Sequence, residues 1–459
     1  MKNNKHQRAL PRRFGRRGFL RGTSLAMASL ALPRTAAARS AAKSPVAGTP
    51  HTFLFVNLRG APDGIAMLAP AQDPDYIANR MVGGTLIEAN APYNRRMAFN
   101  SRWWLPHAMD PLWPVYLQRN LAFIPAAGLL NFNKSHFVAM DRLELGIPPD
   151  AEGHTSPVDN GFVARMLENG GAQPYPPLRG WVASNLAATS FLSAPQSLAI
   201  GNVENFDFPS SASSPLDQGM SDATDDLHEA TSNDVLKAAS RTVFDSITYF
   251  DNVDFNTGVS GLGNNANQYP NNNFGRQFRR AAALILDGCP PEAIEIDLGG
   301  WDHHKDEGPN PNAQLTGGGT MWTLMNILAR TLERFHADLS VAHPGGGDYI
   351  DRVTTICMGE FGRRVAENGD NGTDHGKGGL MLVMGGAQVN GGVYDSHWTQ
   401  IGNVQNPGAG DMTDDEGDVK VAVDYRDILS EAFVKQMNVA DPRSVYFSGY
   451  GYTPLGIFN

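Results

Sequence analysis

Short apolar runs that alternate with amphipathic stretches are the feature that most constrains the fold of this 459-residue chain. Runs predicted as strands are residues 51–58, 121–126, 293–298, 353–358 and 380–384. Stretches predicted as helices are residues 135–145, 160–169, 235–250, 278–287 and 321–339. This alternation is typical of a mostly parallel sheet with helices on both faces. We therefore predict an α/β fold of three layers, α/β/α.

The first 38 residues have the pattern of an export signal. Arg16 and Arg17 begin a segment that resembles the twin-arginine consensus, and an apolar run at 24–32 and small residues at 35–38 follow it. The apolar run is too short to cross roughly 30 Å of hydrocarbon, so we expect no stable membrane anchor. We predict a signal peptide at 1–38, the twin-arginine export machinery as a partner, and a periplasmic or secreted protein.

Charge is distributed unevenly along the chain, whose formal net charge is −10. Residues 1–38 hold nine of the 37 basic residues and no acidic residue, which leaves 28 basic and 47 acidic residues in the rest. A body this acidic repels phosphate backbones, so we expect no nucleic-acid partner.

Beyond the signal we expect a linker at 39–50 and one domain at 51–459. Composition changes near 201–275, which is rich in Ser, Asn, Asp and Gly, and this predicts a flexible insertion inside that domain. Two cysteines, Cys289 and Cys357, are too few for a disulfide scaffold or a Cys-based zinc ribbon. They either pair with each other or are separate buried thiols.

Carboxylates and histidines gather after the predicted strands, where open α/β sheets bind ligands. Asp and His side chains that converge there suit zinc, manganese or iron, as one ion or as two. The candidate metal ligands are Asp63, Asp302, His304, Asp374 and His375, with His304 favoured over its neighbour His303.

These residues also have structural interpretations. Asp63 precedes a glycine and is equally compatible with a turn. Asp374 and His375 lie among glycines, as in an ordinary surface loop. Glu360 and Arg363 are compatible with an ion pair outside any site.

Ser135 precedes a predicted helix, whose first backbone N–H groups favour an anion. The residue is either a nucleophile activated by a metal or a helix cap. Lys134 either pairs with a substrate anion or is a solvated lysine.

Six short motifs occur in an order that resembles an uncharacterised family of exported bacterial proteins, domain of unknown function 1501. They are Leu58–Gly64, Ser135–Phe137, Gly299–His304, Gly359–Arg363, Thr373–Gly376 and Asp424–Asp427, and the resemblance covers roughly residues 51–440. That family is similar to the alkaline-phosphatase and sulfatase superfamily of metallohydrolases. The resemblance thus implies an alkaline-phosphatase-like fold.

The superfamily pattern assigns roles to the same candidates. It implies Asp63, Asp302 with His304, and Asp374 with His375 as metal ligands, and Ser135 as the nucleophile. The spacing between Asp302 and His304 is shorter than is usual in the superfamily, and the closing histidine is either His397 or His136. The expected function is an exported, metal-dependent hydrolase of phosphate or sulfate esters, on a small molecule or a glycan. The alternative is a non-catalytic binding or assembly protein with a structural metal.

Overall fold

The computed structural model describes residues 51–81, 85–89, 91–98, 102–130, 134–146, 160–170, 177–206, 226, 229–288, 290–307, 320–446 and 450–459. The predicted signal peptide and linker lie outside these residues. Contacts divide the chain into two units, and residues 205–252 belong to the smaller one. Its main element is helix α8 (Asp234–Phe250), which begins where the Asn233 side chain accepts a hydrogen bond from the Leu236 N–H at 3.1 Å. This helix confirms the prediction for 235–250.

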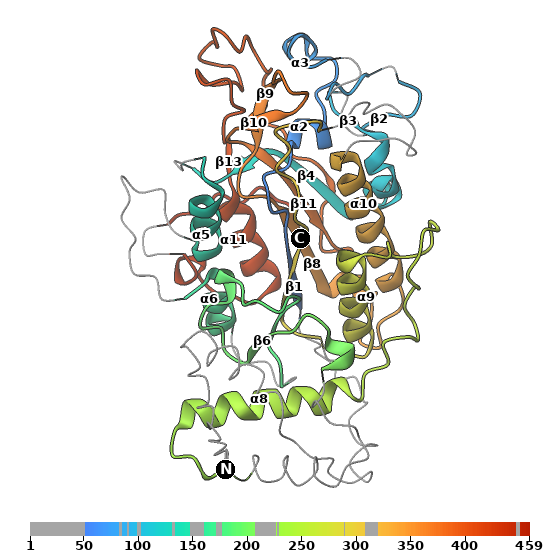
Figure 1. Cartoon of the computed structure of the whole chain (residues 1–459), viewed down its shortest axis with the longest axis vertical. Helices are drawn as coiled ribbons and strands as arrows, with labels where there is room; N and C mark the ends of the chain where they lie inside the picture. The colour runs from blue at the N-terminus through green and yellow to red at the C-terminus, as the bar shows by residue number, and fades with distance from the viewer. Residues whose placement is uncertain are drawn as a thin grey trace, which may run out of the picture. The chain divides into compact units, whose positions relative to one another are not determined.

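A large sheet forms the centre of the other unit (Figure 1). Its strands are β1 (Thr52–Asn57), β4 (Leu121–Gly128), β5 (Gly180–Val182), β6 (Ser197–Ala199), β7 (Ala293–Asp297), β8 (Val353–Met358), β11 (Gly379–Met384), β12 (Gly392–Val393) and β13 (Val423–Asp424). The spatial order is β12-β4-β11-β8-β1-β7-β5-β6, and β13 also pairs with β4. Small antiparallel pairs join β2 (Arg95–Arg96) to β3 (Trp104–Leu105) and β9 (Arg363–Glu367) to β10 (Thr373–His375).

The first strand is central because its sequence is apolar on both faces. All six residues of β1 are buried, and the strand pairs in parallel with β7 on one side and β8 on the other. Side chains alternate between the faces of a strand. Phe53 and Phe55 point to one face, where both lie against Phe162 with ring centroids 6.5 and 5.4 Å away. A strand of this composition is favourable only where helices cover both faces.

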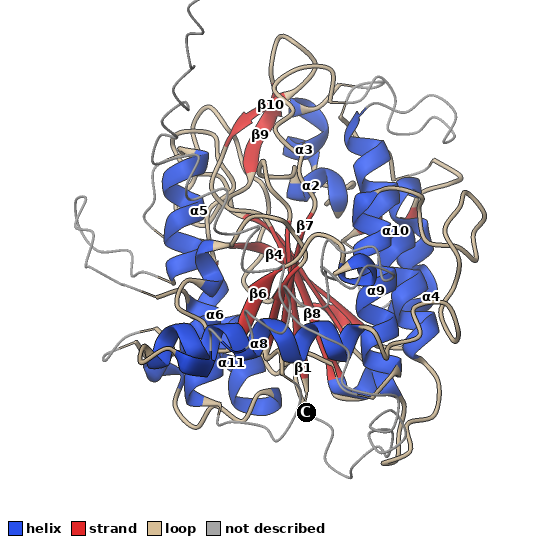
Figure 2. Cartoon of the chain, turned by 60° about the horizontal axis from the view of Figure 1, so that its bottom comes forward, coloured by secondary structure: helices blue, strands red, loops and turns tan. Residues whose placement is uncertain are grey.

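Helices cover both faces of the sheet, as the sequence predicted (Figures 1 and 2). One face carries α5 (His136–Leu145), α6 (Phe162–Asn169) and α11 (Tyr425–Gln436). The opposite face carries α9 (Asn273–Leu286) and α10 (Thr320–Leu339), which pack through Phe278 and Phe335 with ring centroids 5.1 Å apart. Shorter helices are α2 (Gly64–Met67), α3 (Pro74–Asn79) and α4 (Trp113–Leu117). The fold is α/β with a mostly parallel sheet.

Strand β11 runs opposite to the other strands of the sheet. It is antiparallel to both of its neighbours, β8 and β4, whereas the remaining pairings are parallel. The segment between β8 and β11 contains the β9–β10 hairpin and not a crossover helix, so the chain returns beside β8 in the reverse direction. The beginning of β11 therefore lies at the same edge of the sheet as the carboxyl ends of β1, β7 and β8.

Cys357 lies in β8 as a buried free thiol, and burial raises its pKa. Cys289 lies outside the described residues, so its pairing stays a prediction. Within the described ranges, no helix is long and apolar enough to cross a membrane.

Acid should destabilise the protein through His336, which is buried on α10 and accepts a hydrogen bond at Nε2 from Asn120 Nδ2 at 3.0 Å. Burial lowers its pKa from 6.5 to about 4. The unfolded chain thus binds more protons than the folded one between these values, so stability is lost as the pH falls from 6.5 to 4. We expect this histidine to contribute on the order of 2–3 kcal/mol of that loss. Chemical denaturation at several pH values measures it, and an unchanged pH slope in His336→Gln would contradict the assignment.

Candidate metal centre

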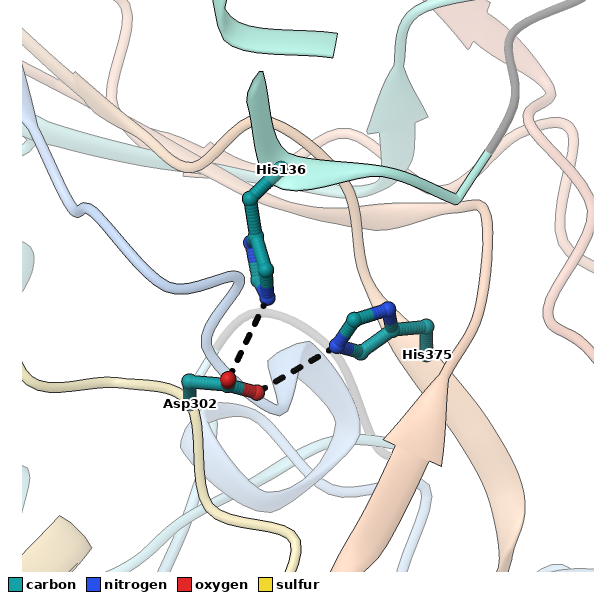
Figure 3. Close-up of side chains that lie close together, drawn as sticks. All are labelled: His136, Asp302 and His375. Atoms are coloured by element: carbon teal, nitrogen blue, oxygen red, sulfur yellow. Dashed lines mark hydrogen bonds and ion pairs between the residues drawn. The ribbon is translucent and has the colours of Figure 1, made fainter. Parts of the chain in front are cut away.

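Three segments that are far apart in sequence bring His136, Asp302 and His375 together (Figure 3). His136 opens α5, Asp302 follows β7, and His375 ends β10 just before β11. Asp302 lies between the two rings: its Oδ2 is 3.4 Å from His136 Nε2 and its Oδ1 is 3.3 Å from His375 Nε2. One ligand atom from each residue lies within 4.8 Å of the others, which is close enough to share one metal ion.

His304 and Asp374 extend this group on its solvent side. His304 Nε2 lies 2.9 Å from His375 Nε2 and 3.1 Å from Asp302 Oδ1. On the other side of the ring, His304 Nδ1 is 3.4 Å from Asp374 Oδ1, which also accepts a hydrogen bond from Asn368 at 3.1 Å. Asp374 thus contacts the group through His304.

A buried carboxylate orients His136 from outside the group. Glu360 is 1% exposed and lies 2.5 Å from His136 Nδ1. It also accepts hydrogen bonds from the backbone N–H groups of Gly60 at 3.0 Å and Ala61 at 3.2 Å. A carboxylate behind a histidine is the usual outer partner of a metal-binding imidazole, because it fixes the ring and raises its basicity.

His375 has an outer partner of the same kind. Its Nδ1 lies 2.8 Å from the backbone carbonyl of Lys134. A carbonyl only accepts, so Nδ1 carries the hydrogen and the Nε2 of the neutral ring presents a lone pair. The same logic applies to His136, whose buried Nε2 has no hydrogen-bond partner among the described residues. Two lone pairs and a carboxylate therefore converge on one point, and this donor set fits a divalent cation.

The surroundings shift the pKa values of the three residues in different directions. Burial opposes the ionisation of Asp302, but the hydrogen bond and charge of Arg363 outweigh it and lower the pKa of Asp302 to about 2. The hydrogen bond to Glu360 raises the pKa of His136. Burial lowers the pKa of His375, so that ring is the more readily neutral one.

Arg363 connects the loops that carry these residues. Its guanidinium is buried and donates hydrogen bonds to four backbone carbonyls and one carboxylate, those of Gly60, Ala61, Trp301, Thr373 and Asp302, at distances of 2.6 to 3.3 Å. Three of these segments follow β1, follow β7 or lie in β10. One side chain thus fixes the backbone before Asp302, the Asp302 carboxylate and the strand that ends at His375.

Gly60 allows two of these loops to touch. Its φ is +114°, a conformation that other residues rarely adopt. A Cβ at this position would lie 2.6 Å from the backbone nitrogen of Asp302. The glycine therefore permits both the turn after β1 and the close approach of the Asp302 loop.

Asp63 is not a member of the group. Its carboxylate is buried in an ion pair with Arg80, whose guanidinium also donates to the carbonyls of Val365 and Arg364. Burial, followed by the negative charge of Asp63, raises the pKa of nearby Glu307 to about 8. Asp63 is therefore a buried carboxylate whose charge is already paired with Arg80.

Lys134 and Ser135 flank the group. The Lys134 ammonium lies 2.7 Å from Glu416 Oε2 and 2.5 Å from Asp418 Oδ2, while its backbone carbonyl meets His375. Ser135 is the N-cap residue of α5, although its side chain makes no capping hydrogen bond. The hydroxyl is therefore adjacent in sequence to His136 and is not used to cap the helix.

Two other histidines near these motifs, His397 and His303, are not part of the group. His397 Nε2 lies 2.8 Å from the carbonyl of Pro125, which leaves His136 as the additional histidine of the group. His303 is buried, and its ring nitrogens have no hydrogen-bond partner in the described residues. Sequence reasoning did not assign the outer roles of Glu360 and Arg363, although their Gly-Glu-Phe-Gly-Arg motif marked the loop.

The chain belongs to the family described as "Protein of unknown function (DUF1501)", whose family model matches residues 165–445. The expected family is therefore confirmed, and the matched region contains Asp302 and His375 but begins after His136. No curated protein matches the chain.

Replacing Arg363 should cost far more stability than replacing its neighbour Arg364. A lysine at 363 keeps the charge, but one ammonium cannot reach acceptors on three segments. We expect Arg363→Lys to lower the free energy of unfolding by roughly 3 kcal/mol or more. The control is Arg364→Lys, which alters a side chain that is 42% exposed and whose Nε lies 3.6 Å from Asp418 Oδ1. This control should change the free energy of unfolding by less than about 1 kcal/mol. Denaturant titrations of both variants make the comparison, and equal losses would contradict the role of Arg363.

Proposed function

We propose that this chain is an exported, metal-dependent hydrolase of phosphate or sulfate esters with an alkaline-phosphatase-like fold. In this proposal His136, Asp302 and His375 hold a divalent metal, with His304 beside them. The single observation that carries the proposal is the convergence of two histidine Nε2 atoms on Asp302, with each Nδ1 held by an outer acceptor. Such an arrangement supports a prebuilt cation site more than an incidental ion pair.

The donor set of nitrogen and carboxylate oxygen fits zinc, manganese or iron. A metal bound there supplies Lewis-acid polarisation of the ester and a lower pKa for a bound water or hydroxyl. The site is reachable, because the side chains of Asp302, His304 and Asp374 are 45, 43 and 48% exposed. Engagement of Asp63 by Arg80 favours one ion at this centre over two.

The chain's own groups supply the remaining functions. In one route the Ser135 hydroxyl loses its proton and attacks the phosphorus or sulfur centre, the ester alcohol leaves, and water then releases phosphate or sulfate from the serine. In the other route Ser135 orients a water that attacks the ester directly and expels the same alcohol. The N-terminal N–H groups of α5, a ten-residue helix, favour the negative charge of the transferring group. The Lys134 ammonium, which contacts Glu416 and Asp418, supplies positive charge for an anionic group of the substrate. Asp374, through His304, positions a ring that can accept a proton from the attacking group.

A periplasmic or secreted location is part of the proposal. It rests on the twin-arginine-like segment at Arg16–Arg21 and on the apolar run that follows. In that location a small-molecule or glycan ester is the proposed substrate. The twin-arginine machinery carries folded proteins, which is compatible with a metal inserted before export.

A second function is a non-catalytic exported binding or assembly protein that uses the metal to hold its loops together. Two contacts favour it: Asp63 is paired with Arg80, and the Lys134 ammonium is paired with Asp418. Both residues would be freer in an active centre of the superfamily type. In this alternative, loss of the metal lowers the melting temperature and no ester is turned over.

Metal content should depend on His136 and His375 and not on His397. We expect about one zinc, manganese or iron ion per chain in the mature protein, and almost none in His136→Ala or His375→Ala, because each substitution removes one ligand of three. His397→Ala is the matched control and should keep its metal, since that ring binds the Pro125 carbonyl. Elemental analysis of the parent protein and the three variants measures the metal content. Equal metal in all four proteins would exclude this site.

Ester hydrolysis should require Ser135. With an aryl phosphate or aryl sulfate as substrate, we expect Ser135→Ala to lower kcat/KM by roughly two orders of magnitude or more while the bound metal is retained. Ser444→Ala, which removes an exposed hydroxyl bonded to the Asp441 carbonyl, should have no effect. Normal turnover in Ser135→Ala would contradict the nucleophile assignment, and no turnover in the metal-loaded parent protein would leave the non-catalytic alternative.

A further inference from the structure

A pair of lysines lies next to the metal centre and shares one acidic side chain. Lys134 precedes α5, and Lys377 lies between β10 and β11. The Oε2 atom of Glu416 is 2.7 Å from Lys134 Nζ and 3.7 Å from Lys377 Nζ. A single carboxylate oxygen therefore faces both ammonium groups, which we call the lysine pair.

Two further carboxylates contact the lysines and are held firmly: Asp414 contacts Lys377, and Asp418 contacts Lys134 and lies 3.8 Å from Lys377 Nζ. Asp418 is fully buried and lies 2.5 Å from Lys134 Nζ. Asp414 accepts a hydrogen bond from Lys377 Nζ at 2.6 Å, and its other oxygen accepts the backbone N–H groups of Glu416 and Asp418 at 3.0 Å each. Asp414 and Asp418 thus belong to the fold of the loop.

Glu416 differs from these two residues because its side chain is 52% exposed, against 13% for Asp414 and 0% for Asp418. Its ion-pair partners among the described residues are the two lysines. Exposed ion pairs of this kind are weak in water. The carboxylate can therefore leave the lysine pair without disturbing the loop. Among the described residues, Lys134, Lys377 and Arg364 then keep Asp414 and Asp418 as acidic partners.

We infer that the lysine pair is a binding site for an acidic group of the substrate, and that Glu416 occupies this site as an internal stand-in until such a group displaces it. That this acidic group belongs to a substrate rests on the function proposed above. The two sites are connected through Lys134, whose carbonyl fixes His375 and whose ammonium forms part of the lysine pair.

This arrangement defines a class of substrate. Lys134 and Lys377 are each two residues from a proposed ligand, His136 or His375, but their ammonium groups contact Asp414, Glu416 and Asp418. The lysine pair therefore lies beside the metal centre and not within it. An ester that uses both sites carries a second phosphate, sulfate or carboxylate in addition to the group that is hydrolysed. Two ammonium groups suit a tetrahedral oxyanion, which offers several acceptor oxygens.

Sulfate and inorganic phosphate binding to the metal-free protein tests the inference. Isothermal titration of the chelator-treated mature protein should give a Kd for either anion that is roughly 5- to 10-fold lower in Glu416→Gln than in the parent, because the internal competitor loses its charge. Asp415→Asn is the matched control, because the Asp415 side chain is exposed and makes no ion pair or hydrogen bond in the described part of the chain. It removes the same charge one residue away and should leave the Kd unchanged.

A double variant locates the effect. Adding Lys377→Met to Glu416→Gln should abolish the gain in affinity, and the melting temperature should confirm that both proteins fold. An unchanged or higher Kd in Glu416→Gln, or an equal gain in Asp415→Asn, would overturn the inference. Because no metal is present, this outcome is independent of whether the loaded protein hydrolyses an ester.

Discussion

The buried guanidinium of Arg363 is the interaction on which the candidate site depends. A buried cation is stable only where its donors are satisfied, and here the acceptors are carbonyls of three different loops and the carboxylate of Asp302. These loops consequently hold one arrangement relative to one another. Glu360 plays the complementary role, since its carboxylate binds the backbone at Gly60 and the ring of His136. Together the two residues of one short motif set the positions of all three proposed ligands.

The direction of one strand decides which residues meet. If β11 were parallel to β8, its amino end and the preceding His375 would lie at the opposite edge from Asp302. The β9–β10 hairpin reverses the chain, and so His375 enters the edge where β1, β7 and β8 end. The rule that ligands bind at the carboxyl ends of strands thus holds for Asp302, whereas His375 reaches the same place from the start of a strand.

The site has an inner group of ligands and an outer layer of charge. In the inner group, the Nε2 atoms of two histidines and the carboxylate of Asp302 suit a cation. Around it, Lys134 and Lys377 contact the carboxylates of Asp414, Glu416 and Asp418, and of these three side chains only that of Glu416 is largely exposed. A metal centre that attracts one anion and a lysine pair that attracts another would select substrates by the spacing of two acidic groups.

The sequence by itself determined the α/β class, the main helices and strands and the family. It did so because hydrophobic periodicity and short ordered motifs are local properties of the chain. It also marked Asp302, His304 and His375, since polar residues after buried strands are unusual enough to notice.

Only the tertiary structure decided that His136 joins Asp302 and His375, that Asp63 pairs with Arg80, and that Glu416 bridges two lysines. The residues in each of these contacts are separated by between 17 and more than 200 positions, as in the pairs Asp63–Arg80 and Lys134–Glu416. Their meeting depends on strand order, on the reversal of β11 and on which side chains the core can bury. None of these three features can be read from the spacing of residues within a single segment.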